Sequence, residues 1–194
     1  MEYFRKPRLT STEPHMSRRR FLGVGACATG ISLFPRLAPA QSRLTGSPEK
    51  SLAFYNTHTG ETFKSVYWFR GRYLPDALQA VNRLLRDHHV DEIRSIDPEL
   101  LDLLYAIVQE VDATEPIHVV SGYRSPITNA ILRQHNRRVA EDSLHVQGKA
   151  VDIKIPGRSV AVVRRAAIAL QGGGVGYYPY AQFVHVDTGP VRSW

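Results

Sequence analysis

The chain has 194 residues, of which 43% are hydrophobic and 22% are charged, a composition typical of a globular protein with room for one hydrophobic core. Its net charge of +7 is unevenly placed: residues 1–40 hold seven Lys/Arg and two Asp/Glu, so the remainder carries only +2. This distribution argues against a nucleic-acid-binding surface. We therefore expect no nucleic-acid partner.

The basic N-terminal stretch has the three parts of an export signal. Paired arginines lie in residues 17–22 (SRRRFL), a weakly apolar Gly/Ala-rich stretch runs to residue 33, and residues 37–40 (LAPA) end in an Ala-x-Ala pattern. This order is typical of a twin-arginine signal peptide, with cleavage expected after Ala40. It predicts the twin-arginine export machinery as a partner and a periplasmic location. The apolar stretch is too short to be a permanent membrane anchor, and we expect no stable membrane span after the signal is removed.

The single cysteine, Cys27, lies within this predicted signal, so cleavage would leave a mature chain without thiols or disulfides. Residues 24–27 (VGAC) also weakly resemble a lipoprotein cleavage site, and lipidation of Cys27 stays an open alternative. Residues 41–50 are small and polar. We expect them to be a linker to a single domain that covers residues 51–194.

The first part of this domain shows a hairpin followed by two helices. Residues 51–57 and 61–69 are rich in aromatic and β-branched side chains, and the Thr59-Gly60 pair between them favours a turn. A helix is expected from Pro75, where apolar residues recur at spacings of three and four. A second helix is expected from Asp97, a capping residue followed by proline.

The second part alternates less regularly between short apolar runs and helical patterns. Strands are expected at 116–120, 150–155, 174–178 and 183–187, and helices at 127–137 and 160–170. Strands and helices in blocks, joined by short loops, favour an α+β fold. The expected architecture is a small, mainly antiparallel sheet with helices packed on one side.

Two segments of this second part carry side chains suited to a metal site: residues 143–152 (SLHVQGKAVD) and 183–187 (FVHVD). Side chains alternate across a strand, so Asp152 and His185 each point away from the apolar residues beside them. If the two strands are neighbours, both side chains can reach one ion, with His145 supplied by the loop before its strand. Three protein ligands leave the fourth position of a tetrahedral zinc free for water, as in catalytic rather than structural sites. The sequence therefore predicts one zinc ion per chain, on the sheet.

The remaining histidines lack such a joint pattern, and we interpret them as ordinary surface or core residues. They are His15, His58, His88, His89, His118 and His135.

The pattern His-x-x-Gly-x-Ala-x-Asp over residues 145–152 resembles the first ligand motif of the zinc D-alanyl-D-alanine carboxypeptidases, dipeptidases and murein endopeptidases. Residues 174–178 (GVGYY) and 183–190 (FVHVDTGP) resemble the closing segment of the exported branch of this superfamily. The resemblance covers about residues 50–194, with the motifs in the family's order. It implies zinc bound by His145, Asp152 and His185. It also implies hydrolysis of peptide bonds in peptidoglycan stem peptides or cross-links by a zinc-activated water.

Residues 121–125 (SGYRS) resemble an upstream loop of the same superfamily, whose arginine lies near the substrate. The resemblance implies that Arg124 binds a substrate carboxylate or carbonyl and stabilises developing negative charge. Tyr123, beside it, is expected to contribute to substrate binding. The alternative is that Arg124 fixes its own loop through a structural ion pair.

The expected general base departs from the family pattern. Many relatives have Glu or Asp three residues before the second histidine, where this chain has Gln182, which cannot accept a proton at neutral pH. Others have a histidine two residues before it, where this chain has Phe183. The nearest carboxylate is Asp187, which could orient a ligand, accept a proton from the zinc-bound water, or cap the turn that follows.

Two other functions stay open at this point. A non-catalytic zinc-containing module that binds cell-wall peptide is motivated by Gln182. An exported scaffold in which these histidines and aspartates are structural would bind no metal.

Overall fold

The structure, a computed structural model, describes residues 48–136 and 139–194. The predicted signal peptide (1–40), Cys27 and most of the predicted linker lie outside the described residues. Strand β1 begins at Glu49, so the last two residues of the expected linker belong to the sheet. Over the described ranges, none of the helices has the length and apolar character needed to cross a bilayer.

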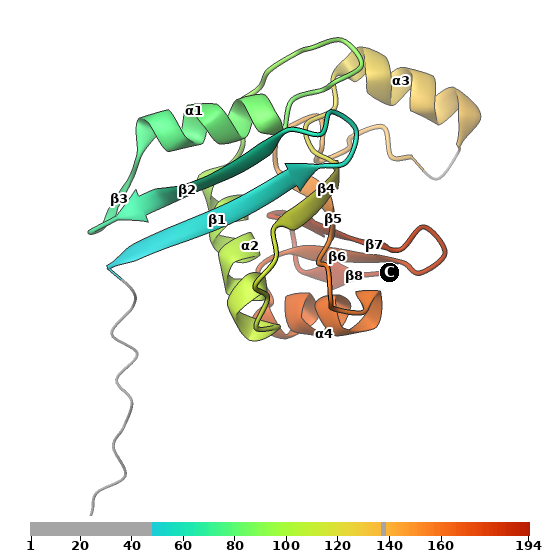
Figure 1. Ribbon diagram of the computed structural model, residues 1–194. Helices are drawn as coiled ribbons and strands as arrows, with labels where there is room; N and C mark the ends of the chain where they lie inside the picture. Colours follow the sequence, from blue (N-terminus) through green and yellow to red (C-terminus); the bar gives the residue numbers. More distant parts are fainter. Residues whose placement is uncertain (1–47, 137–138) are drawn as a thin grey trace, which may run out of the picture. The chain divides into compact units, whose positions relative to one another are not determined.

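Eight strands of the described residues form one sheet in the order β3-β2-β1-β4-β5-β7-β6-β8 (Figure 1). The strands are β1 (Glu49–Asn56), β2 (Thr62–Phe69), β3 (Arg72–Tyr73), β4 (Ile117–Ser121), β5 (Ala150–Lys154), β6 (Gly174–Tyr178), β7 (Phe183–Asp187) and β8 (Arg192–Ser193). All strand pairs are antiparallel except β1–β4 and β6–β8. The mainly antiparallel sheet is confirmed, as is the hairpin β1–β2. The sheet is larger than expected, because the hairpin is continuous with the other strands and two short strands extend its edges.

The four predicted helices are confirmed as α1 (Pro75–Leu84), α2 (Pro98–Glu110), α3 (Pro126–His135) and α4 (Val160–Leu170). Three begin with a side-chain cap: the side chains of Asp97, Ser125 and Ser159 accept hydrogen bonds from backbone N–H groups in the first turns of α2, α3 and α4. Such caps satisfy donors that a helix leaves unpaired at its start. The capping residues therefore determine where each of these three helices begins.

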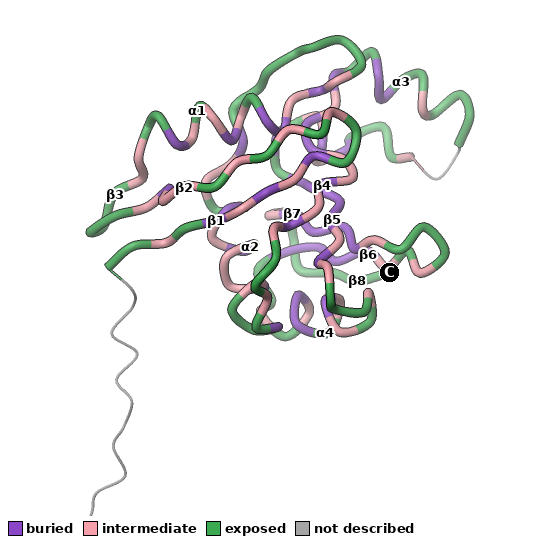
Figure 2. Tube along the Cα trace, in the orientation of Figure 1, coloured by how far each residue is buried: buried purple, intermediate pink, exposed green. Residues whose placement is uncertain are grey.

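The hydrophobic core lies between the sheet and α1, α2 and α4. Helix α1 contacts β2, α2 contacts β1 and α4, and α4 contacts β6 and β7. Alternate residues of the central strands supply the sheet's share, including Val151, Ile153, Val184 and Val186, all buried in one cluster. Figure 2 shows this burial along the central strands, and Figure 1 shows α3 beyond the end of β4, away from α2 and α4. The intervening residues of β5 and β7 point to the opposite face, where the predicted ligands lie.

Gly148, in the loop between His145 and β5, has a φ of 70°, and a Cβ added there would overlap the carbonyl oxygen of Ser95. We expect Gly148→Ala to lower the free energy of unfolding by at least about 2 kcal/mol. Two costs add: an alanine is strained at this positive φ, and its Cβ would overlap the backbone of Ser95. Gly157 is a matched control, since its φ of 72° is similar but a Cβ added there would meet no other part of the chain within 4 Å. Urea unfolding of both variants checks the prediction, and equal losses would contradict it.

Candidate metal centre

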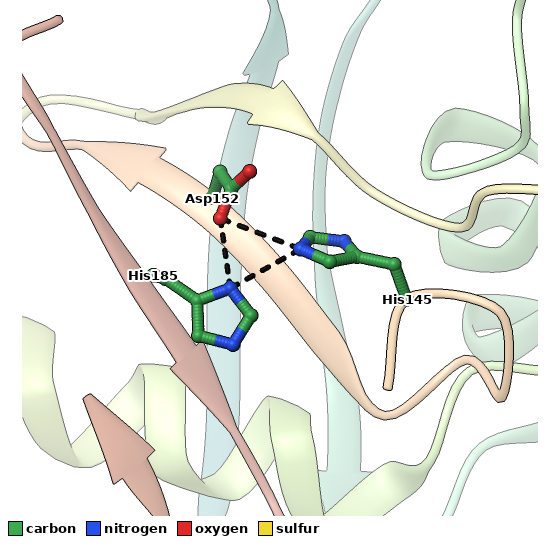
Figure 3. Close-up of side chains that lie close together, drawn as sticks. All are labelled: His145, Asp152 and His185. Carbon is green, nitrogen blue, oxygen red and sulfur yellow. Dashed lines mark hydrogen bonds and ion pairs between the residues drawn. The ribbon is translucent and has the colours of Figure 1, made fainter. Parts of the chain in front are cut away.

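The three predicted ligands come from three local elements and meet on one face of the sheet. Asp152 in β5 and His185 in β7 are direct partners in the antiparallel register. His145 lies in the loop that leads into β5, and Gly148 closes a turn there by donating its N–H to the carbonyl of His145. All three side chains are buried. Figure 3 shows them pointing toward one another. The side-chain alternation that the sequence predicts therefore places Asp152 and His185 together.

The facing atoms of these residues have the spacing of ligands around one small cation. Nδ1 of His185 lies 2.9 Å from Oδ1 of Asp152 and 3.1 Å from Nε2 of His145, and the latter two atoms are 3.4 Å apart. Zinc bonds of roughly 2.0–2.1 Å at tetrahedral angles place two ligand atoms about 3.3–3.4 Å apart. One of the three separations equals that value and the other two are shorter, so the three atoms lie close enough together to share one ion. Figure 3 shows both rings and the carboxylate converging on one point.

Hydrogen bonds at the far side of each ring decide which nitrogen is free. Nδ1–H of His145 donates to the carbonyl of Gly122 at 2.8 Å, and Nε2–H of His185 donates to Oδ2 of Asp187 at 3.0 Å. Each ring therefore presents an unprotonated nitrogen toward Asp152. Three acceptor atoms in mutual contact repel one another unless a cation lies among them. The donor set thus fits a divalent metal.

The electrostatics of the cluster agree with this fit. Burial opposes ionisation of Asp152, but the charges and hydrogen bonds of His145 and His185 outweigh it and hold the pKa of this carboxyl well below its usual range. Burial lowers the pKa of His185, yet its hydrogen bonds to Asp152 and Asp187 raise that pKa overall. The lowered pKa keeps Asp152 ionised at neutral pH, which is the form that binds a cation, and the raised pKa of His185 reflects the negative charge of the two carboxylates beside it.

Asp187 lies behind His185 and is fully buried, with both carboxylate oxygens engaged. Oδ1 accepts from the N–H groups of Gly174 and Gly189 and from Nη1 of Arg192, at 2.8–3.1 Å. Oδ2 accepts from His185 and from Nη2 of Arg192 at 2.7 Å. A carboxylate has about four lone-pair positions, so these hydrogen bonds fill the capacity of Asp187 as an acceptor. Although burial opposes ionisation, these donors hold the pKa of Asp187 well below its usual range.

Strand β8 and the residue that follows it, Trp194, supply two contacts to the site that the sequence did not reveal. Arg192 forms the bidentate pair with Asp187, and the ring of Trp194 lies with its centroid 5.3 Å from that of His185. Gly176 leaves room for this arrangement, since a Cβ there would lie 2.9 Å from the Trp194 ring. Arg192 follows the last recognisable motif, and no spacing connects it to Asp187. The parallel pairing of β8 with β6 brings the two together.

Arg124 and Tyr123, the two predicted substrate-binding residues of the 121–125 loop, have different surroundings in the structure. Arg124 is half-buried, and this burial lowers the pKa of its guanidinium although the charge of Asp152, followed by that of Asp87, opposes the shift. Tyr123 is buried and its hydroxyl bonds to Glu92, so the phenol is directed to the loop after α1 and away from the three ligands. Burial and the bond to Glu92 raise the pKa of Tyr123 to about 12.

The residues at the positions of the missing base lie outside the ligand cluster. Gln182 occupies the turn between β6 and β7, is exposed, and donates its amide to the carbonyl of Pro179. Phe183 stacks on Tyr178, with ring centroids 4.5 Å apart. Neither side chain has a polar contact with His185.

The fold and the cluster together define a protein with a buried His/Asp/His group that could hold a metal ion, an arrangement of the type that metallopeptidases use. Residues 45–194 match the family described as peptidoglycan L,D-endopeptidase MepK, and the chain belongs to this peptidase family. Peptidoglycan L,D-endopeptidase MepK of Escherichia coli K12 is 39% identical over 178 residues, which are 92% of this chain and 97% of the relative. A probable peptidoglycan L,D-endopeptidase MepK of Haemophilus influenzae is 37% identical over 180 residues, 92% of this chain and 95% of the relative. No solved structure matches the chain significantly.

Proposed function

We propose that this protein is a zinc-dependent endopeptidase that cleaves L,D bonds between peptidoglycan stem peptides. The observation that carries the proposal is the convergence of His145, Asp152 and His185 in a chain whose relatives are named for this activity. The sequence left the stereochemistry of the bond open, and the names of the relatives favour an L,D bond. The same relatives support an exported protein, for which residues 17–40 would supply a twin-arginine signal.

The proposed roles follow from the contacts of each residue. His145, Asp152 and His185 would hold one zinc ion, which polarises a carbonyl and brings a bound water to a pKa of about 7. Gly122 and Asp187 fix the two rings in the tautomers that ligation requires. Arg124, half-buried in the 121–125 loop, would bind the substrate and stabilise negative charge on the attacked carbonyl. Both carboxylate oxygens of Asp187 are fully engaged in hydrogen bonds, which favours a positioning role for this residue over proton transfer.

Removing the metal is expected to abolish hydrolysis, because the zinc would both activate the attacking water and polarise the substrate carbonyl. Purified protein dialysed against a chelator should release no fragments from cross-linked muropeptides, and one equivalent of zinc should restore release. Chromatography of the products and elemental analysis of the protein provide the two measurements. Undiminished activity in metal-free protein would contradict the proposal. One bound zinc per chain without fragment release would instead favour a cell-wall peptide-binding module.

A further inference from the structure

Three aromatic side chains lie next to His185 on the face of the sheet that carries the metal cluster. Strands β7, β6 and β8 are neighbours at one edge of the sheet (Figure 1). Tyr178 of β6 and Phe183 of β7 are direct partners, and because alternate residues of a strand share a face, both lie on the same face as His185. The ring centroid of Trp194 is 5.3 Å from that of His185. We call Tyr178, Phe183 and Trp194 the aromatic platform.

The three rings of the aromatic platform form one continuous surface. Phe183 and Tyr178 stack with an angle of 19° between their ring planes. Nε1–H of Trp194 donates to the hydroxyl oxygen of Tyr178 at 3.1 Å. Gly176 lets the two rings meet over β6, since a Cβ there would lie 2.9 Å from atoms of both Tyr178 and Trp194. Strand pairing therefore builds the platform and holds it beside the metal centre.

The aromatic platform is exposed although its rings are largely apolar. Tyr178 is 37% exposed and Trp194 is 49% exposed. An aromatic side chain buries about 150–250 Å² when it is fully covered, so these two side chains leave roughly 200 Å² uncovered. A stable protein–protein interface takes about 800 Å² from each partner. The platform alone is too small for a second copy of this chain, and its area suits a small ring-shaped group.

The chemistry of the aromatic platform matches a sugar ring. The face of an aromatic ring is electron-rich, so it attracts the weakly positive C–H groups that line one face of a sugar ring. Polar groups lie at the edge: the indole N–H, the hydroxyl of Tyr178, and the guanidinium of Arg192, 5.0 Å from the Trp194 ring. The Tyr178 oxygen accepts from Trp194, which leaves its own O–H to donate. Hydroxyl and acetamido groups around an amino sugar can bond to this edge, whereas an aliphatic peptide side chain would cover the rings alone.

We propose that the aromatic platform binds a sugar ring of the glycan strand to which the stem peptide is attached. The inference rests on the proposed function, because that function identifies the polymer whose peptide lies at the metal. It adds a preference to that function: a stem peptide that still carries its sugars binds more tightly than the free peptide. The sugar is tethered to the peptide, so its contact adds affinity without a second loss of translational freedom.

The test uses the full chain and one stem peptide without a cross-link, prepared with and without its disaccharide. Because this peptide has no cross-link to cut, calorimetry measures binding alone. The parent should bind the sugar-bearing form about tenfold or more tightly, which corresponds to about 1.4 kcal/mol. Tyr178→Leu removes the flat ring but keeps an apolar side chain, and it should lower this ratio at least about threefold. Tyr178→Phe keeps the ring and should retain most of the ratio.

Phe69→Leu is the matched control for the loss of an exposed ring. Phe69 is 40% exposed, close to Tyr178, and it ends β2, near the opposite edge of the sheet. Its variant should show the same ratio as the parent. Circular dichroism checks the fold of each variant, and the exposure of Tyr178 makes both of its substitutions compatible with the core.

Equal binding of the two peptides by the parent would overturn the proposal. A ratio that Tyr178→Leu leaves unchanged would do the same, including the case in which both peptides bind more weakly, because the platform would then contact the peptide. If Tyr178→Phe loses as much as Tyr178→Leu, the hydroxyl and not the ring carries the effect, which excludes stacking. Cleavage of cross-linked muropeptides is measured separately. Cleavage without a sugar preference would remove the platform's role alone, and a sugar preference without cleavage would remove the proposed hydrolysis alone.

Discussion

Replacing His145 with alanine is expected to leave the protein without its metal and to lower peptide hydrolysis by about 10³-fold or more. His145 supplies one of three ligand atoms that lie within 3.4 Å of one another. The two that remain cannot close a stable site around zinc. A metal that polarises the carbonyl and activates water contributes several kcal/mol to the transition state, and about 1.36 kcal/mol corresponds to a factor of ten.

A second readout of the same variant does not depend on activity. Zinc at 100 times its dissociation constant should stabilise the parent against unfolding by about 2.7 kcal/mol and leave His145→Ala unaffected. His118→Ala is the control, since this half-buried histidine of β4 contacts Tyr55 and has no part in the cluster. It should keep the metal, the zinc-dependent stabilisation and the activity. A His145→Ala protein that binds one zinc and hydrolyses muropeptides like the parent would refute this assignment.

The clustering of His145, Asp152 and His185 was predictable because it depends on local rules. Alternation along a strand placed Asp152 and His185 away from the core, and the family motif singled out His145 from the other histidines. What the sequence did not contain was the strand order that makes β5 and β7 neighbours. That pairing brings together residues 33 positions apart and could only be assumed before the structure.

The parts that were missed all arise from long-range pairing. Strands β3 and β8 have two residues each, too few to show any periodicity. Arg192 reaches Asp187 only because the chain reverses after β7 and pairs with β6 in parallel. His58 and His88, interpreted from the sequence as ordinary histidines, stack on each other although they belong to separate loops.

Asp187→Asn is expected to weaken zinc binding by about 10–100-fold, the usual effect of removing the partner of a metal-bound histidine. Every group that faces this carboxylate is a donor: His185, Arg192 and the N–H groups of Gly174 and Gly189. The amide of asparagine would direct its own donors at some of them, whichever way it is turned. We therefore also expect a loss of about 1–3 kcal/mol in the free energy of unfolding. The exposed Asp76→Asn is the control for the change in charge.

The same variant separates the roles considered for Asp187. If it accepts a proton from the metal-bound water, kcat falls while the metal is retained. If it positions His185, zinc affinity falls first, and excess zinc restores much of the activity. Arg192→Met should reproduce part of the affinity loss, because Arg192 holds the same carboxylate through two bonds. The two substitutions should then be less than additive by about 1 kcal/mol or more in zinc affinity, as expected for neighbours in one network. Full additivity would show that Arg192 does not act through Asp187, and a kcat loss with unchanged zinc affinity would reassign Asp187 as the base.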